Sequence, residues 1–284
     1  MSEIVRDYYD ACVNFEWGRL TDPYHRFELE STRRLIDEYF PSEGRIVDVG
    51  GGPGRYTVEL LQRGHSVSLV DLSAEAIEFA KRKLAELGLE AELVACADAR
   101  CLDCLNSAAF DAGLLLGPLY HLVDEEDRRK ALSEFHRILK PGAPGIVGFI
   151  NPWGILRSGL NEFPTFYANR EDAAALLGTY HKIGEQAAFT ESVFLPPPQA
   201  LDELRAAGFA VEARAGVEGF ASGMLDEVAR IAEEDPEAYE NILLLVAETC
   251  QHPAYRDCTE HLHVVVRRLD GRWDQPETRA ETSS

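Results

Sequence analysis

The sequence has no long apolar run, few cysteines and a shortage of basic residues. Its longest apolar segments, residues 113–120 and 242–247, are far shorter than the ~20 residues that a membrane-spanning helix needs. Residues 1–7 show no basic stretch followed by an apolar one, so no secretory signal is expected. Six cysteines among 284 residues do not indicate a disulfide scaffold. These features predict a cytoplasmic protein that has no membrane partner.

Acidic residues dominate the charge of the chain. It carries 49 Asp and Glu against 28 Lys and Arg, a formal net charge of −21. A surface of this sign repels phosphate backbones, so nucleic acid is not expected as a partner unless a local basic groove overrides the average. The apolar share of 45% is sufficient for a core. The length suits one α/β domain that carries an insertion or a cap.

Short apolar strands alternate with helical segments between residues 45 and 150. The expected strands are residues 45–49, 66–71, 92–97, 110–116 and 145–150. The helices expected between them are residues 56–64, 73–87 and 124–139. Such alternation predicts a parallel sheet with helices on both faces.

The segments before and after this core lack the regular alternation of strands and helices. Residues 1–43 are polar and helical and are predicted to form an N-terminal lid, ahead of a main domain at residues 44–268. Within that domain we expect a helical cap insertion at 152–198, a helix at 201–207, a strand at 209–214, a helical insertion at 225–250 and a last strand at 261–268. The polar residues 269–284 have little to bury, so a frayed tail is expected.

A glycine cluster follows the first expected strand, with the spacing Asp48-x-Gly50-x-Gly52-x-Gly54 and a further glycine at Gly51. Glycines at a strand-to-helix turn let backbone N–H groups approach a ligand, and the helix N-terminus adds partial positive charge. The dinucleotide fingerprint G-x-G-x-x-G would place its last glycine where Arg55 stands. A dinucleotide-dependent oxidoreductase therefore remains only a remote alternative.

Two more acids end the next two strands. Asp71 can accept hydrogen bonds from both hydroxyls of a ribose. Asp98 can accept from an exocyclic amine such as that of adenine, while the N–H of Ala99 can donate to a ring nitrogen. Either acid could instead cap a turn. Acids at three successive strand ends favour a nucleoside-containing cofactor over that alternative.

Together, these motifs resemble the class I, Rossmann-fold S-adenosylmethionine-dependent methyltransferases. The resemblance rests on residues 48–54, Asp71-Leu72-Ser73, Ala97-Asp98-Ala99, Phe110-Asp111 and residues 139–142. It covers residues 44–151 closely and 196–268 more loosely. It implies a doubly wound, seven-stranded, mostly parallel sheet whose last strand is antiparallel.

The resemblance also implies a cofactor site for S-adenosylmethionine, with S-adenosylhomocysteine as the product. The glycine loop would hold the methionine part, Asp71 the ribose, and Asp98 with Ala99 the adenine, with Leu72 and Leu116 as further contacts. The segment Leu116-Gly117-Pro118-Leu119-Tyr120-His121-Leu122 is similar to one subgroup, whose members are largely methyltransferases of unassigned substrate.

Tyr120 and His121 are the catalytic candidates, because the loop after the fourth strand faces the methyl group in this fold. Methyl transfer is an in-line displacement, so the enzyme mainly positions the nucleophile and removes a proton where needed. His121 could be a general base, since its ordinary pKa is near neutrality. The alternative is that His121 only hydrogen-bonds the backbone and shapes the pocket.

Two motifs are absent after the fourth strand. Residues 116–119 offer neither the Asp/Asn-Pro-Pro-aromatic motif of amide-directed methyltransferases nor the metal-binding carboxylate of catechol-type enzymes. Both absences argue against a nucleobase as the acceptor and against metal-assisted methyl transfer. The clusters of cysteine around residue 101 and of cysteine and histidine around residue 258 lack the paired spacing of zinc sites, so no metal is predicted.

The acceptor is expected between the lid and the cap. The lid candidates are Trp17, Arg19, Tyr24, His25 and Arg26. Phe166 and Tyr167 could line the acceptor pocket from the cap, although buried aromatic side chains usually only fill a core. We expect a monomeric or homodimeric enzyme that methylates N, O or S of a small organic acceptor, with RNA or a protein side chain as the alternative acceptor.

Overall fold

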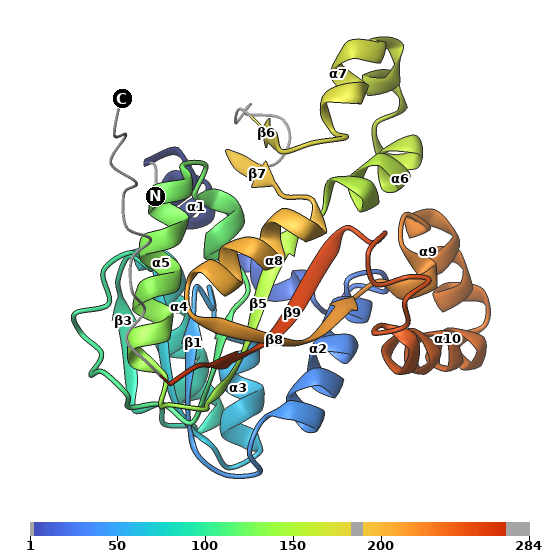
Figure 1. The fold of residues 1–284 in the computed structure, drawn as a ribbon. Coiled ribbons are helices and arrows are strands. Elements are labelled where there is room, and N and C mark those ends of the chain that lie inside the picture. The colour runs from blue at the N-terminus through green and yellow to red at the C-terminus, as the bar shows by residue number, and fades with distance from the viewer. Residues whose placement is uncertain (1–2, 183–189, 271–284) are drawn as a thin grey trace, which may run out of the picture.

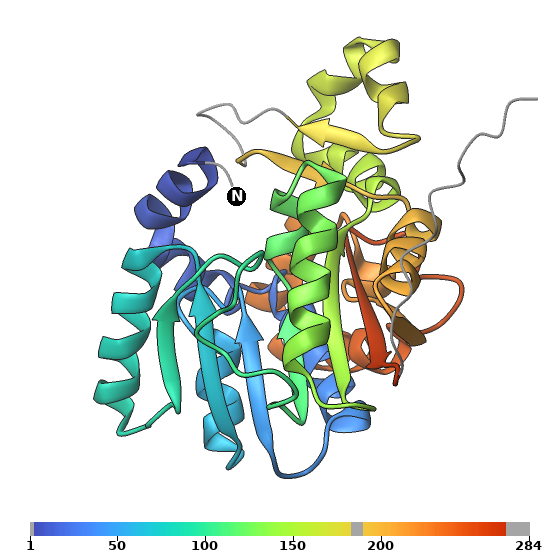
Figure 2. The same ribbon diagram turned by 60° about the vertical axis from the view of Figure 1, so that its left-hand side comes forward.

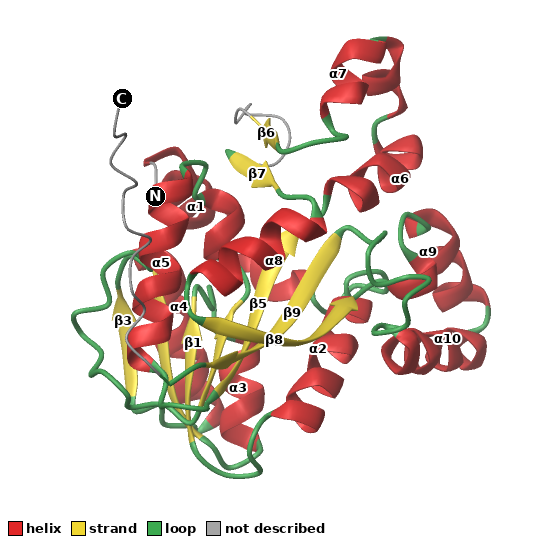
Figure 3. Ribbon diagram, viewed as in Figure 1, coloured by secondary structure: helices red, strands yellow, loops and turns green. Residues whose placement is uncertain are grey.

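The computed structural model describes residues 3–182 and 190–270 and contains a seven-stranded sheet with the order β3-β2-β1-β4-β5-β9-β8. The strands are β1 (Arg45–Val49), β2 (Ser66–Asp71), β3 (Leu93–Cys96), β4 (Ala112–Leu115), β5 (Pro144–Ile150), β8 (Phe209–Gly216) and β9 (His261–Arg268). Strand β9 is antiparallel to both of its neighbours, and the remaining pairs are parallel. The predicted seven-stranded, mostly parallel sheet is therefore confirmed (Figures 1 and 3).

Helices cover both faces of the sheet, because successive strand residues point to opposite sides. The helices α2 (Arg26–Tyr39), α3 (Arg55–Gln62) and α4 (Ala74–Leu87) pack on one face, where they meet Ile46, Val67 and Leu69. The helices α5 (Glu125–Ile138) and α8 (Pro197–Ala206) pack on the other face against Val47 and Val264. Both faces of the sheet are thus buried, as the apolar strands predicted.

Helix α1 (Glu3–Arg19) lies over the carboxyl ends of β1 and β2 (Figure 2). It is amphipathic only weakly, and its buried residues are Val5 and Val13. The segment predicted as one polar lid thus contains two helices, α1 across the strand ends and α2 against the sheet. Among residues 3–182 and 190–270, no helix is both long and apolar enough to cross a membrane.

The cap differs from the wholly helical insertion that we expected. It contains α6 (Pro152–Glu162), α7 (Arg170–Ala175) and an antiparallel pair of short strands, β6 (Tyr180–Lys182) and β7 (Ser192–Phe194). Tyr180 and Phe194 face each other across this pair with ring centroids 5.5 Å apart. Aromatic and β-branched residues at facing positions favour strand pairing, which the helical prediction overlooked.

The second insertion is two helices, α9 (Leu225–Glu234) and α10 (Pro236–Thr249). Pro236 cannot continue α9 but suits the first turn of α10, and Asp235 caps α10 by accepting from the N–H of Ala238 at 3.0 Å. Helix α8 begins at Pro197, four residues earlier than predicted, for the same reason. The predicted tail lies outside the described residues from 271 onward.

Phe135 of α5 lies against two glycines on neighbouring strands. A Cβ atom placed on Gly113 of β4 would lie 2.7 Å from the Phe135 ring, and one on Gly145 of β5 would lie 2.8 Å from it. Phe135 itself is fully buried. The two glycines therefore let α5 approach the sheet closely beside the strands that lead to the site.

We expect Gly113→Ala to lower the free energy of unfolding by about 1–3 kcal/mol, because the added methyl overpacks the Phe135 contact. Gly178→Ala is the matched control, since a Cβ there meets nothing within 4 Å. Urea denaturation measures both, and the control should change the stability by less than about 0.5 kcal/mol. Equal stability of the two variants would contradict this packing argument.

Candidate active site

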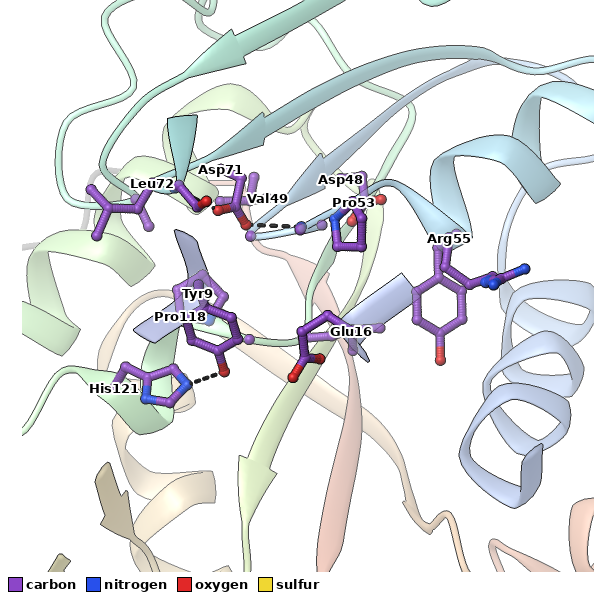
Figure 4. A pocket seen from close by; sticks show the side chains of 18 of the residues that line it. Tyr9, Glu16, Asp48, Val49, Pro53, Arg55, Asp71, Leu72, Pro118 and His121 are labelled. Carbon is purple, nitrogen blue, oxygen red and sulfur yellow. Dashed lines mark hydrogen bonds between the residues drawn. The ribbon is translucent and has the colours of Figure 1, made fainter. Parts of the chain in front are cut away.

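A pocket of about 980 Å³, counting its open mouth, lies at the carboxyl ends of β1, β2 and β4 (Figure 4). Strand β1 lies between β2 and β4, so the chain crosses from one side of β1 to the other at this point. Ligands of open α/β sheets bind in the crevice at such a switch point. Helix α1 and the 3₁₀ turn η1 (Pro118–His121) bound the pocket on its open side.

The glycine turn after β1 packs directly on η1. Gly50 has φ +72°, and a Cβ atom there would lie 2.4 Å from the Pro118 ring. Gly52 has φ +54°, but a Cβ there would meet nothing within 4 Å. Gly50 is thus required by packing, whereas Gly52 leaves open space in front of its backbone. Gly54, at φ +86°, starts α3.

Asp48 and Asp71 hold this turn from two sides. The buried Asp48 carboxylate accepts a hydrogen bond from Thr57 Oγ1 at 2.7 Å. Burial, with a contribution from nearby Asp71, raises the pKa of Asp48 to about 6. Asp71 accepts from the N–H of Gly52 and from the N–H of Ser73, each at 2.8 Å, and burial raises its pKa also (Figure 4). Both acids line the pocket.

Asp98 is not among the residues that line the pocket, although its neighbours Ala97 and Ala99 are. Its carboxylate accepts from Arg100 Nη2 at 2.7 Å and from the Arg100 N–H at 2.9 Å. Burial opposes its ionisation, but these contacts outweigh burial and lower the pKa of Asp98 to about 2. The structure thus brings Asp48, Asp71 and Ala99 together, and it turns the Asp98 side chain toward Arg100. Leu72 and Leu116, which we predicted to contact the cofactor, also line the pocket.

His121 is only 3% exposed and is hydrogen-bonded through both ring nitrogens. Its Nδ1 is 2.9 Å from the carbonyl oxygen of Glu191, and its Nε2 is 2.7 Å from the hydroxyl of Tyr9 on α1 (Figure 4). A carbonyl oxygen only accepts, so Nδ1 carries the proton and the Tyr9 hydroxyl donates to Nε2. Burial lowers the pKa of His121 to about 4.

An ion-pair cluster borders the pocket beside the glycine turn. Arg19 donates to Glu28 at 2.7 Å and to Glu16 at 3.3 Å. Burial opposes the ionisation of Glu28, but Arg19 holds the pKa of that carboxyl far below its usual range. All three residues line the pocket. Tyr9, Glu16 and Glu28 were not among the predicted site residues. Glu16 and Glu28 belong to the N-terminal segments 16–20 and 24–28, which also resemble the methyltransferase subgroup, and Tyr9 had no such signal.

The pocket fits the S-adenosylmethionine that the sequence resemblance implies. The space in front of Gly52 admits a ligand against the backbone. The Asp71 carboxylate, already ordered by two N–H groups, keeps acceptor capacity for ribose hydroxyls. The small side chains of Ala97 and Ala99 leave a flat wall beside Leu72. The pocket thus offers a suitable group for each part of a nucleoside that carries a methionyl tail.

Comparison with known proteins gives the class of enzyme. Residues 46–142 match the family described as a methyltransferase domain. The chain is 26% identical to the tRNA 5-carboxymethoxyuridine methyltransferase of Escherichia coli (strain K12), over 83% of this chain and 84% of that protein. The chain is an S-adenosylmethionine-dependent methyltransferase.

Other relatives of this methyltransferase have different acceptors in their names. It is 32% identical to the glycine/sarcosine N-methyltransferase of Halorhodospira halochloris, over 57% of this chain and 60% of that protein. Its fold resembles the 1,6-didemethyltoxoflavin-N1-methyltransferase of Burkholderia thailandensis, solved with 1,6-didemethyltoxoflavin and S-adenosylhomocysteine, with a TM-score of 0.57, 17% identity and coverage of 94% and 88% of the two chains. The tRNA methyltransferase among the relatives conflicts with our expectation that nucleic acid is not a partner.

The predicted lid residues take different places in the methyltransferase. Of the five, only Arg19 is among the residues that line the pocket. Trp17 holds α1 to its neighbours, because the Arg55 guanidinium lies 3.8 Å above its ring and Phe79 of α4 lies 5.5 Å from it. The side of α1 that borders the pocket thus carries Arg19, while Trp17 faces α3 and α4.

The other three lid candidates lie beyond the end of α1, where the chain turns away from the pocket. The buried Tyr24 hydroxyl donates to Glu260 at 2.5 Å. His25 is hydrogen-bonded to Asp22, and Arg26 donates to Glu240 of α10 at 2.8 Å. Tyr24 and Arg26 therefore join the N-terminal segment to the residue that precedes β9 and to α10, whereas His25 bonds within the segment.

The cap aromatics are also not among the residues that line the pocket. The Tyr167 hydroxyl donates to the carbonyl of Leu156 within the cap. Phe166 packs on the apolar cluster of Ile150, Leu176 and Phe194, and Tyr120 packs on the same cluster. Tyr120 also lines the pocket, so this cluster joins the cap to the pocket wall.

Asp71 and Asp98 should differ in their effect on cofactor affinity. We expect Asp71→Ala to weaken S-adenosylhomocysteine binding about 10- to 100-fold, because a charged hydrogen-bond acceptor is lost from the pocket. Asp98→Ala should weaken it less than about threefold, because Arg100 already holds that carboxylate. Isothermal titration calorimetry measures both, and a larger loss in Asp98→Ala would refute the assignment.

His121 should titrate far below the ordinary histidine range. Its lowered pKa of about 4 means that the folded protein resists protonation. The unfolded chain binds the proton from about pH 6.5 downward, so His121 costs stability as the pH falls from 6.5 toward 4. The His121→Gln variant should lose less stability than the wild type over this range. An imidazole NMR titration assigned with that variant measures the pKa, and a midpoint near 6.5 would contradict it.

Proposed function

We propose that this methyltransferase methylates an N, O or S atom of a small organic acceptor that enters beside the cap. The observation that carries the proposal is the junction at Tyr120, which lines the cofactor pocket and packs on the apolar cap cluster. An acceptor held against that cluster would meet the end of the pocket at η1. Tyr120 and His121 are accordingly proposed to lie at the acceptor end of the site.

The residues around the pocket would carry out an in-line displacement mainly by positioning. Bound S-adenosylmethionine supplies an activated methyl group on its sulfonium. The glycine turn and Asp71 would fix the position of the nucleoside and methionyl parts. Helix α1 would keep water from the reacting atoms, since its inner face lines the pocket from Val5 to Arg19.

Two features support a small acceptor. The cap contributes buried apolar side chains, Leu176 and Phe194, next to the pocket wall, which suits a compact organic molecule more than an RNA backbone. The net charge of −21 also disfavours long-range attraction of a polyanion. The glycine/sarcosine N-methyltransferase among the relatives acts, by its name, on small amines.

A modified nucleoside in tRNA is the second candidate acceptor. Its support is the tRNA methyltransferase of E. coli, whose likeness extends over 83% of this chain and so includes segments outside the methyltransferase domain. Binding of tRNA by so acidic a chain would need a local basic surface, and its affinity would fall steeply with salt.

The two candidates separate in one set of measurements. Calorimetry with S-adenosylhomocysteine and with NAD should show binding of the first and none of the second. Transfer of radiolabelled methyl should then be measured to glycine, sarcosine, a phenol, a thiol and tRNA, with Asp71→Ala as the variant of low cofactor affinity. We expect a small acceptor to be labelled. Labelling of tRNA alone would replace the proposal with the second candidate, and binding of NAD without S-adenosylhomocysteine would refute both.

A further inference from the structure

The inner face of α1 runs along the whole pocket. Val5, Arg6, Glu16 and Arg19 of this helix line the pocket. Asp10 contacts Ser73 just after the end of β2, and Trp17 stacks on Arg55 directly after the glycine turn. Tyr9 of the same helix also lines the pocket, opposite η1 (Figure 4). When the adenine lies at Ala99 and the methionyl part at the glycine turn, the ribose and the sulfonium lie between them. Tyr9 therefore faces the part of the pocket where the methyl group is transferred.

The hydrogen bonds of His121 fix which nitrogen of its ring donates and which accepts. Nδ1–H donates to the Glu191 carbonyl at 2.9 Å, and Nε2 accepts from the Tyr9 hydroxyl at 2.7 Å. With both nitrogens occupied and only 3% of the residue exposed, the imidazole does not present a lone pair to the pocket. The Tyr9 oxygen, whose proton points at His121, has its own lone pairs left for a ligand.

We propose that Tyr9 is a catalytic residue whose hydroxyl oxygen takes the proton of the acceptor while its own proton passes to Nε2 of His121. This proposal rests on the proposed function, since it needs an acceptor that loses a proton. His121 would then act through Tyr9, which reconciles the two roles that the sequence left open for it. Neither Tyr9 nor its pairing with His121 is evident from the sequence.

The proposed step is balanced in atoms and charge. For an acceptor X–H, the X–C bond forms as the S–C bond breaks. The X–H proton goes to the Tyr9 oxygen, the Tyr9 proton goes to Nε2, and His121 becomes an imidazolium whose Nδ1–H stays on Glu191. One positive charge leaves sulfur as one appears on the ring, so the net charge of the site is unchanged. Burial disfavours the imidazolium, so the ring releases its proton readily after the transfer. The proton leaves to water when the product is released.

The starting protonation states suit this relay. Burial lowers the pKa of His121 to about 4 and raises the pKa of Tyr9 well above its usual value, with Tyr120 and Glu16 adding to the second effect. The other groups that act on Tyr9 are Tyr8 and Arg19 of α1. At neutral pH Tyr9 is thus a hydroxyl and His121 an unprotonated acceptor.

The first test needs no acceptor and uses sinefungin, an S-adenosylmethionine analogue with an amino group at the position of the methyl. Its ammonium should donate to the Tyr9 oxygen. Tyr9→Phe should therefore raise the Kd of sinefungin about tenfold, while the Kd of S-adenosylhomocysteine changes less than about twofold. Tyr8→Phe is the matched control, because Tyr8 is adjacent on α1 and not among the residues that line the pocket. An unchanged ratio of the two Kd values in Tyr9→Phe overturns the proposal.

The second test measures methyl transfer to the acceptor found in the panel above. Tyr9→Phe should lower kcat about 10²- to 10⁴-fold with little change in KM, the range for loss of a general base. Its rate should then rise with pH as the acceptor ionises unaided, whereas the Tyr8→Phe rate should follow the wild type. A Tyr9→Phe enzyme with wild-type kcat and pH profile overturns the relay. Wild-type protein that fails to bind S-adenosylhomocysteine would instead refute the proposed function, so the two failures are distinguishable.

Discussion

The close contact between the glycine turn and η1 is the constraint on which the rest of the site depends. Gly50 leaves no room for a side chain against Pro118, and its carbonyl oxygen lies 3.2 Å from where a Cβ of Gly117 would be. The turn after β1 therefore presents only backbone to the Pro118 ring and to Gly117 in the loop after β4. Asp71, at the end of β2, then joins the same turn through the Gly52 N–H. Three strand ends are thereby fixed around one space.

Helix α1 closes that space through contacts with several separate segments. Asp10 accepts from the Ser73 hydroxyl at 2.5 Å at the N-terminus of α4, and Trp17 packs under Arg55 of α3. Arg19 pairs with Glu28 of α2, and Tyr9 reaches His121 of η1. Each contact alone is modest, but they act on one rigid helix, so its inner face is aligned along the whole pocket. The proposed roles of α1 as lid and as source of a catalytic hydroxyl both follow from this alignment.

Features that depend on neighbours in sequence were predicted well. The strands, the glycine turn and the place of Asp71 at the end of β2 were predicted because strand ends, turn glycines and a following N-cap such as Ser73 interact within a few residues. Asp98 shows the limit of this reasoning. Its position at a strand end was correct, but the choice between the pocket and Arg100 depends on side-chain geometry that spacing does not encode. Tyr24 and Arg26 were misplaced because the chain turns after α1 toward β9 and α10.

The sequence by itself determined the alternation of strands and helices, the glycine turn that only glycine can form, and the acids at the strand ends, because these follow from local backbone sterics and hydrogen bonding. It also determined the net charge of −21, because that charge depends only on how many acidic and basic residues the chain has. Only the tertiary structure decided that Tyr9 meets His121 across 112 positions and that Arg19 lies between Glu16 and Glu28 at the pocket. Those pairings arise from the packing of α1 across the strand ends, which depends on the whole fold at once.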